Sequence, residues 1–302
     1  MGSKLFCFML LDALRSLTSP TATRFGAWLG VMAFHFGIRR QLVRETLGLT
    51  LGLRGPLRAR IARQAYATMG ANFIEIWTAG GLDGIERHVE MANPLWTRAL
   101  QARHPGMVMA TAHLGSWDAA LIGSRGCFTR VLAYAKAQHN ALVDKRLNVC
   151  RQITGAEILL TRQGDRTGAV TVIRALRSGG VVGLLGDQRP RQEEADAGVF
   201  LGQAAWCHPG AAFFAQRAGV VVVPGFALRV RSGLTRVYIL RPFRVDGLPP
   251  AAATQRVMDV LSACIAAFPG QYFWHHRRFS DVPETVPVVA DPNWRSGLPF
   301  LR

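Results

Sequence analysis

The stretch Met107-Val-Met-Ala-Thr-Ala-His113-Leu-Gly-Ser-Trp-Asp118 decides how this chain folds. The apolar run at residues 106–110, which overlaps the start of this stretch, is typical of a buried strand, and a helix-like segment begins near Trp117. His113 would then follow the carboxyl end of a strand. Open α/β sheets bind their ligands at that end, so the stretch predicts a site as well as a strand.

The spacing of His113 and Asp118 restricts how they can meet. Two residues five positions apart in one helix point about 140° away from each other. They can pair only if His113 lies in a turn before the helix, and Gly115 would allow that turn. A paired, neutral imidazole can take a proton from an attacking hydroxyl, while the carboxylate fixes its tautomer. The alternative interpretation is a histidine bonded to an aspartate for stability alone, and spacing does not separate the two.

Further apolar runs follow this stretch and alternate with helix-like segments. Candidate strands are 131–135, 157–160, 181–185, 220–224 and 235–240, and candidate helices are 140–154, 168–178 and 209–218. Such alternation predicts an α/β fold in which a mostly parallel sheet is flanked by helices. Residues 39–104 read as helical, with apolar residues every three or four positions between Arg58 and Trp77.

The chain begins with an apolar and basic segment. Residues 1–63 hold ten basic and two acidic residues, interleaved with apolar runs such as Phe25–Ile38. That run has 14 residues, fewer than the roughly 20 that cross a bilayer. We therefore expect residues 1–38 to form a membrane-associating helical layer and residues 39–302 to form a single α/β domain. Helices that simply cover a soluble core are the alternative.

Composition limits the classes of function. The net charge of +17 comes from 36 basic and 19 acidic residues and attracts polyanions, acidic carrier proteins or anionic lipids. A nucleic-acid partner is not expected, because no recognisable basic and aromatic binding module is present. Five cysteines without a Cys-x-x-Cys pair argue against a thiolate metal site and a disulfide framework. No Gly-x-Ser-x-Gly sequence supplies a hydrolase nucleophile.

His113-Leu-Gly-Ser-Trp-Asp118 closely resembles the His-x4-Asp/Glu block of the bacterial lipid A biosynthesis acyltransferases, in the lysophospholipid-acyltransferase-like superfamily. Further blocks resemble that family in the same order: Arg39–Arg44, Tyr66–Glu75, Asn140–Asp144 with Arg151, Leu184–Gln188, Val199–Gly202, Pro209–Gly210, Val223–Pro224 and Phe273–Arg278. Together they span roughly residues 35–280. Several ordered blocks are far more specific than a lone histidine and aspartate.

The resemblance implies a glycerolipid-acyltransferase-like fold and an O-acyltransferase activity. A fatty acyl chain would pass from acyl carrier protein or acyl-CoA to a hydroxyl of a glycolipid, at the cytoplasmic face of the bacterial inner membrane. No metal or cofactor is expected, because the acyl thioester is a co-substrate. His113 would be the general base oriented by Asp118. Substrate-binding or oxyanion roles would fall to Arg151, Asn140, Asp187 and Gln188.

Departures from the family pattern leave the acceptor open. The chain has Asp118 where the family commonly has glutamate, a short apolar lead, and an unusual stretch at residues 189–196. A lysophospholipid or glycerophosphate acyltransferase shares the dyad, but the phosphate-binding block of those enzymes is absent. A related branch that acylates another lipid or a specialised metabolite is a further alternative. Arg277 and Arg278 are candidates for acidic headgroups or carrier phosphates, or for a solvated face.

Overall fold

A seven-stranded sheet forms the centre of the computed structural model, which describes residues 13–124, 126–136, 155–161 and 166–294. The strand order is β1-β9-β8-β2-β5-β3-β4, and every neighbouring pair runs parallel except the antiparallel pair β8 and β9. The strands are β1 (Val89–Met91), β2 (Met107–Thr111), β3 (Val131–Lys136), β4 (Glu157–Thr161), β5 (Val181–Leu185), β8 (Val221–Arg231) and β9 (Leu234–Ile239). The prediction of a mostly parallel α/β sheet is confirmed.

Helices cover both faces of the sheet, as the alternation of side chains along the central strand β2 requires. Val108 and Ala110 of β2 belong to a core built with α8 (Arg166–Arg177), α9 (Gly210–Ala218) and α10 (Pro250–Ala267). Met107 packs with Leu100 of α5 (Pro94–Arg103) on the opposite face, where α6 (Trp117–Gly123) packs against β8 and β9.

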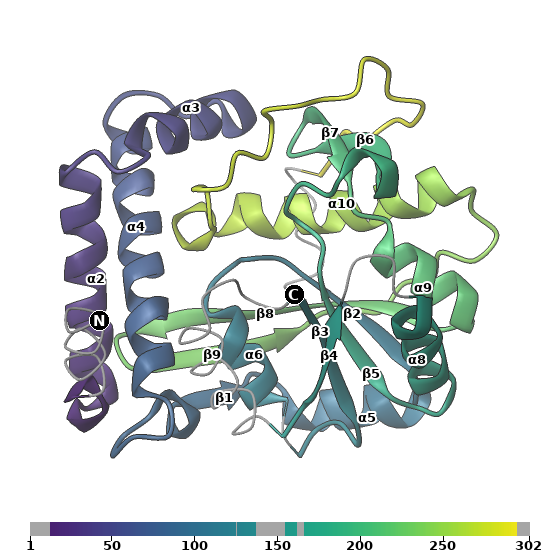
Figure 1. The fold of residues 1–302 in the computed structure, drawn as a ribbon, viewed down its shortest axis with the longest axis horizontal. Helices are drawn as coiled ribbons and strands as arrows, with labels where there is room; N and C mark the ends of the chain where they lie inside the picture. Colours follow the sequence, from purple (N-terminus) through teal and green to yellow (C-terminus); the bar gives the residue numbers. More distant parts are fainter. Residues whose placement is uncertain (1–12, 125, 137–154, 162–165, 295–302) are drawn as a thin grey trace.

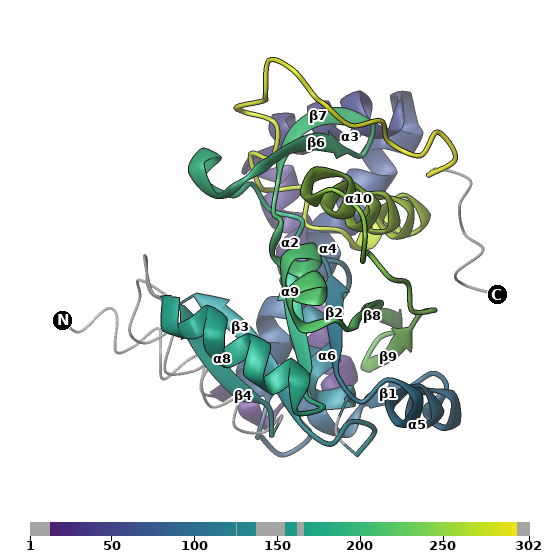
Figure 2. The ribbon, with the colours of Figure 1, turned by 90° about the vertical axis from the view of Figure 1, so that its right-hand side faces the viewer.

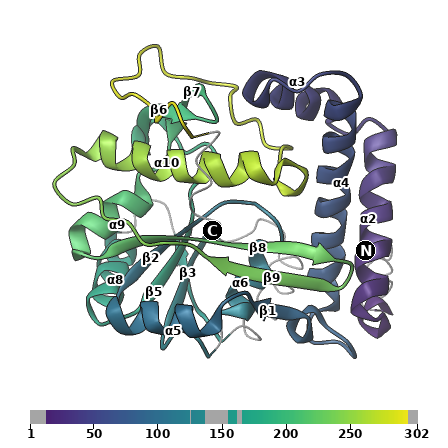
Figure 3. The same cartoon turned by 180° about the vertical axis from the view of Figure 1, so that it is seen from behind.

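A layer of N-terminal helices stands beside the tip of the β8–β9 hairpin (Figure 1, Figure 3). It consists of α2 (Ser19–His35), α3 (Arg40–Leu51) and α4 (Gly55–Thr78). Helices α2 and α4 touch backbone to backbone: a Cβ atom added at Gly26, Gly30 or Gly70 would overlap main-chain atoms of the facing helix. Small residues at these positions therefore set the spacing of the pair.

Helix α2 lies within the helical layer predicted for residues 1–38, and α3 and α4, which the sequence assigns to the α/β domain, stand beside it. The domain boundary at residue 38 stays a prediction. The apolar run at residues 25–38 supplies most of α2, which begins earlier, at Ser19. Within the described ranges, the structure contains no helix that is long and apolar enough to cross a bilayer.

A two-stranded hairpin, β6 (Asp196–Phe200) and β7 (Gln203–Cys207), was not expected from the sequence. It packs against α10, on the side of that helix away from the central sheet (Figure 2). The Gln255 side chain of α10 fixes the hairpin, because it bonds both the amide and the carbonyl of Val199. The candidate helix at residues 140–154 lies outside the described residues.

Candidate active site

The turn between β2 and α6 carries His113, as the sequence predicts. Leu114 donates to the Ala112 carbonyl at 2.6 Å, and the chain then reverses through Gly115, whose φ is +68°. A Cβ atom at Gly115 would overlap the Ala227 carbonyl of β8, so both the backbone angle and the space require glycine. The strand thus ends in a tight turn that holds the imidazole at the carboxyl edge of the sheet.

Asp187 is the direct partner of the His113 imidazole. Its Oδ1 lies 2.9 Å from Nδ1 of His113 and also accepts a 3.1 Å hydrogen bond from the His113 backbone amide. Asp187 follows the end of β5, the parallel neighbour of β2, and its side chain is only 1% exposed. A carboxylate in this position holds the proton on Nδ1 and leaves the lone pair of Nε2 for chemistry.

The other ring nitrogen faces Gln188. The side-chain nitrogen of Gln188 lies 3.3 Å from Nε2 of His113. Two aromatic rings form the adjacent walls, with centroids 4.9 Å (Trp117) and 6.0 Å (Phe273) from that of the imidazole. The side chain of His113 is 17% exposed, so the imidazole is largely shielded from water.

Neighbouring charges keep His113 a usable base despite its burial. Burial disfavours the imidazolium, but the charge and hydrogen bond of Asp187, together with the charge of Asp118, outweigh it and raise the pKa of His113 above its ordinary value. Burial also opposes ionisation of Asp187, yet the His113 charge and hydrogen bond and the Tyr272 hydroxyl lower the pKa of Asp187. The pair therefore favours an ionised aspartate beside a histidine that readily accepts a proton.

Asp118 lies in the first turn of α6. Its charge raises the pKa of His113, which places the two side chains in electrostatic reach. Among the described residues, the hydrogen-bonding partners of the imidazole are Asp187 and Gln188. Orientation of His113 by Asp118 stays a prediction. The carboxylate that contacts the imidazole in the structure is that of Asp187.

The structure brings Asp187 and Gln188 to His113, as their position after a predicted strand suggested, although their part in substrate binding stays a prediction. Arg151 and Asn140 lie outside the described residues, so their predicted roles are not tested.

Two further residues belong to the site: Arg278, which the sequence indicated as a candidate without placing it, and Tyr272, which the sequence did not indicate. Arg278 is 4% exposed, and its Nε donates to the Asp187 carbonyl at 2.8 Å. Its guanidinium lies over the Phe200 ring, 4.9 Å from the centroid. Of the two alternatives for this arginine pair, a solvated face fits Arg277, which is exposed, but not Arg278. Tyr272, also buried, carries a pKa raised well above its ordinary value by burial and by the Asp187 charge.

Comparison with known proteins identifies the family of this chain. Residues 4–281 match the family model for the bacterial lipid A biosynthesis acyltransferases. The chain is also similar to the lipid A biosynthesis lauroyltransferase of Escherichia coli (strain K12), with 26% identity over 281 residues, covering 90% of this chain and 89% of that protein. The match spans the sheet, the His113 turn and the N-terminal helices alike. The chain therefore belongs to the bacterial lipid A biosynthesis acyltransferase family.

Proposed function

We propose that this protein transfers a fatty acyl chain from a thioester, carried by acyl carrier protein or CoA, to a hydroxyl of a lipid A-type glycolipid. The observation that carries the proposal is the His113 imidazole, whose Nδ1 is tied to the buried Asp187 while Nε2 faces the site. Membership of the family supports an acyltransferase, and the arrangement supplies the general base that such a transfer needs.

The proposed reaction uses the acceptor as its own nucleophile. Nε2 of His113 takes the proton of the acceptor hydroxyl as its oxygen attacks the thioester carbonyl carbon. The new C–O bond forms and a tetrahedral oxyanion results. When this collapses, the C–S bond breaks and the imidazolium returns its proton to the departing thiolate. Asp187 and Asp118 stabilise the imidazolium between these steps, which explains why two carboxylates near one histidine suit this chemistry. No metal or cofactor is required by this sequence of steps.

We further propose that the protein lies on the cytoplasmic face of the bacterial inner membrane through its N-terminal layer. Phe25, Trp28 and Leu29 are exposed at helical spacing on α2, so they share one face of that helix. The exposed Arg24 and Arg44 add positive charge to the same layer. An exposed apolar face in a layer that also carries exposed arginines suits a surface of anionic lipids.

A transfer assay tests the proposed activity. Purified protein is mixed with a labelled acyl carrier protein or acyl-CoA and with either a lipid A precursor glycolipid or a lysophospholipid. We expect labelled glycolipid, and a loss on the order of 10² to 10⁴ in rate for His113→Gln. His104→Gln serves as the control, because His104 precedes the opposite, amino end of β2. Full activity in His113→Gln would contradict the mechanism, and transfer to lysophospholipid alone would contradict the acceptor.

A further inference from the structure

A closed ring of hydrogen bonds holds the turn that follows His113. The side-chain nitrogen of Asn72 donates to the Gly115 carbonyl at 2.6 Å, and the Gly115 amide donates to the Gln271 carbonyl at 2.9 Å. The Gln271 side chain makes two hydrogen bonds to the Arg229 backbone: it accepts from the amide at 2.9 Å and donates to the carbonyl at 3.0 Å. Nη2 of Arg229 donates to Oδ1 of Asn72 at 2.5 Å, and this bond closes the ring. We call these four residues the Gly115 ring.

Arg229 determines which way the Asn72 amide points. A guanidinium can only donate, so it must face the oxygen of the amide and turn the NH2 group toward Gly115. Asn72 is 3% exposed, so its side-chain amide is shielded from water. Arg229 thus fixes the orientation of the amide that holds the turn.

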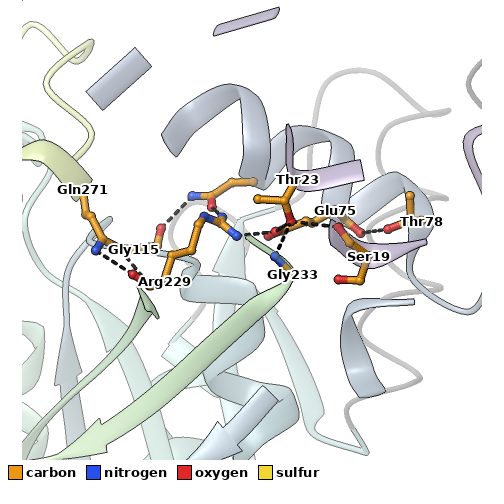
Figure 4. A network of polar contacts seen from close by, with 9 residues as sticks. Ser19, Thr23, Glu75, Thr78, Gly115, Arg229, Gly233 and Gln271 are labelled. Atoms are coloured by element: carbon orange, nitrogen blue, oxygen red, sulfur yellow. Dashed lines mark hydrogen bonds and ion pairs between the residues drawn. The ribbon is translucent and has the colours of Figure 1, made fainter. Parts of the chain in front are cut away.

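A second buried contact fixes Arg229 from the N-terminal layer. Its Nη1 pairs with Oε1 of Glu75, one turn beyond Asn72 on α4, and Glu75 is 1% exposed. Thr23 of α2 lies 2.6 Å from the same Glu75 oxygen and accepts from the amide of Gly233, at the tip of the β8–β9 hairpin. Figure 4 shows this chain of contacts running from the Gly115 turn to α2.

We propose that Asn72 is a positioning residue for His113, held in its working orientation by Arg229 and Glu75. Gly115 lies two positions after His113, and the His113 carbonyl accepts at 3.0 Å from Phe273, two positions after Gln271. The ring therefore fixes the backbone immediately downstream of the base, while Asp187 fixes the imidazole from the other side. A displacement of about 1 Å at a reacting group can cost about 10² in rate.

The expected effect on rate rests on the proposed acyl transfer, whereas the effect on the turn does not. Asn72→Asp keeps the shape and the acceptor for Arg229 but cannot donate to Gly115. Asn72→Ser removes both contacts without adding charge, in case the aspartate variant fails to fold. Gln101→Glu is the matched control, because this buried amide also donates to a backbone carbonyl, that of Pro105, at the opposite end of β2.

Three measurements are made on the full chain: kcat and KM for the acyl donor, the melting temperature, and hydrogen exchange of the peptide covering residues 112–118. We expect kcat to fall about 10- to 100-fold in the Asn72 variants with KM within about threefold, and exchange in 112–118 to rise. Gln101→Glu should lower the melting temperature and leave kcat and that peptide unchanged.

Unchanged kcat in folded Asn72 variants, or equal losses in Gln101→Glu, would overturn the positioning role. If the proposed function is wrong, the wild-type protein itself will transfer no acyl group to any acceptor, which distinguishes this result from a loss confined to the Asn72 variants. In that case the exchange of residues 112–118 still decides whether Asn72 holds the turn.

Discussion

Replacing Asp187 by asparagine tests the central contact of the site. The asparagine would keep the size of the side chain but lose its charge, and the two hydrogen bonds at 2.9 and 3.1 Å would lose their charged acceptor. A hydrogen bond to a charged group contributes about 1.5–3 kcal/mol and a neutral one about 0.5–1.5 kcal/mol, so losing the charge of both acceptors costs about 2–3 kcal/mol. At about 1.4 kcal/mol for each factor of ten, kcat should fall roughly 30- to 150-fold if the whole loss is felt in the transition state.

The same substitution has a signature in the pH dependence of the rate. A general base must be neutral, so kcat/KM rises as His113 loses its proton with increasing pH. Because Asp187 and Asp118 together raise the pKa of His113, the acid limb of the wild-type profile should lie above pH 6.5, the ordinary value. Without the Asp187 charge, burial acts with less opposition, so the limb should move to lower pH.

The assay is the initial rate of acyl transfer between pH 5 and 9 for the wild type, Asp187→Asn and Asp118→Asn. We expect the larger loss of kcat in Asp187→Asn, because Asp187 touches the imidazole, and a lower-pH limb in both variants. The reasoning is refuted if Asp187→Asn keeps wild-type kcat, or if its acid limb moves to higher pH. A larger loss in Asp118→Asn would instead assign the orienting role to Asp118.

Three further outcomes follow from the packing. Gly30→Ala should destabilise the protein by about 1–3 kcal/mol and lower its melting temperature by several degrees, because the new methyl overlaps the backbone of α4. Gly48→Ala should be neutral or stabilising, because its methyl would press only on the flexible end of Arg58 and would meet the Leu53 carbonyl at an ordinary contact distance. Trp28→Glu should weaken binding to anionic vesicles by at least about tenfold in a sedimentation assay while leaving the melting temperature unchanged. Cys207, whose pKa burial raises to about 11, should resist iodoacetamide at pH 8 in native protein and react after unfolding, as mass spectrometry would show.

Local patterns in the sequence predicted the elements that carry the site. The strand before His113, the strand before Asp187 and helix α4 are each marked by an apolar run or a helical period, and the structure confirms them. The contact between His113 and Asp187 needs more, because it depends on β2 lying beside β5 in the sheet. Strand order is a property of the whole chain, so the sequence placed both residues at strand ends without showing that they touch.

The remaining differences have similar causes. The strand predicted to end at Pro224 continues to Arg231. Pro224 is the last β8 residue paired with β2, so its missing amide hydrogen interrupts no further hydrogen bond between these two strands. Arg278 is buried because the Phe200 ring and the Asp187 carbonyl meet it there, and both come from distant segments. A pair of arginines next to histidines gives no local sign of such burial.

The docking of the N-terminal helices has a consequence for the order in which the chain can fold. Thr23 bonds the amide of Gly233, and Arg39 donates to the carbonyl of His275, so these early residues find their partners only after most of the chain has left the ribosome. Until then, the buried Glu75 lacks Arg229, and the α4 surface that will meet the sheet stays uncovered. During synthesis, the first helices therefore lack these partners, and part of their apolar surface stays exposed until β8 and β9 have been made.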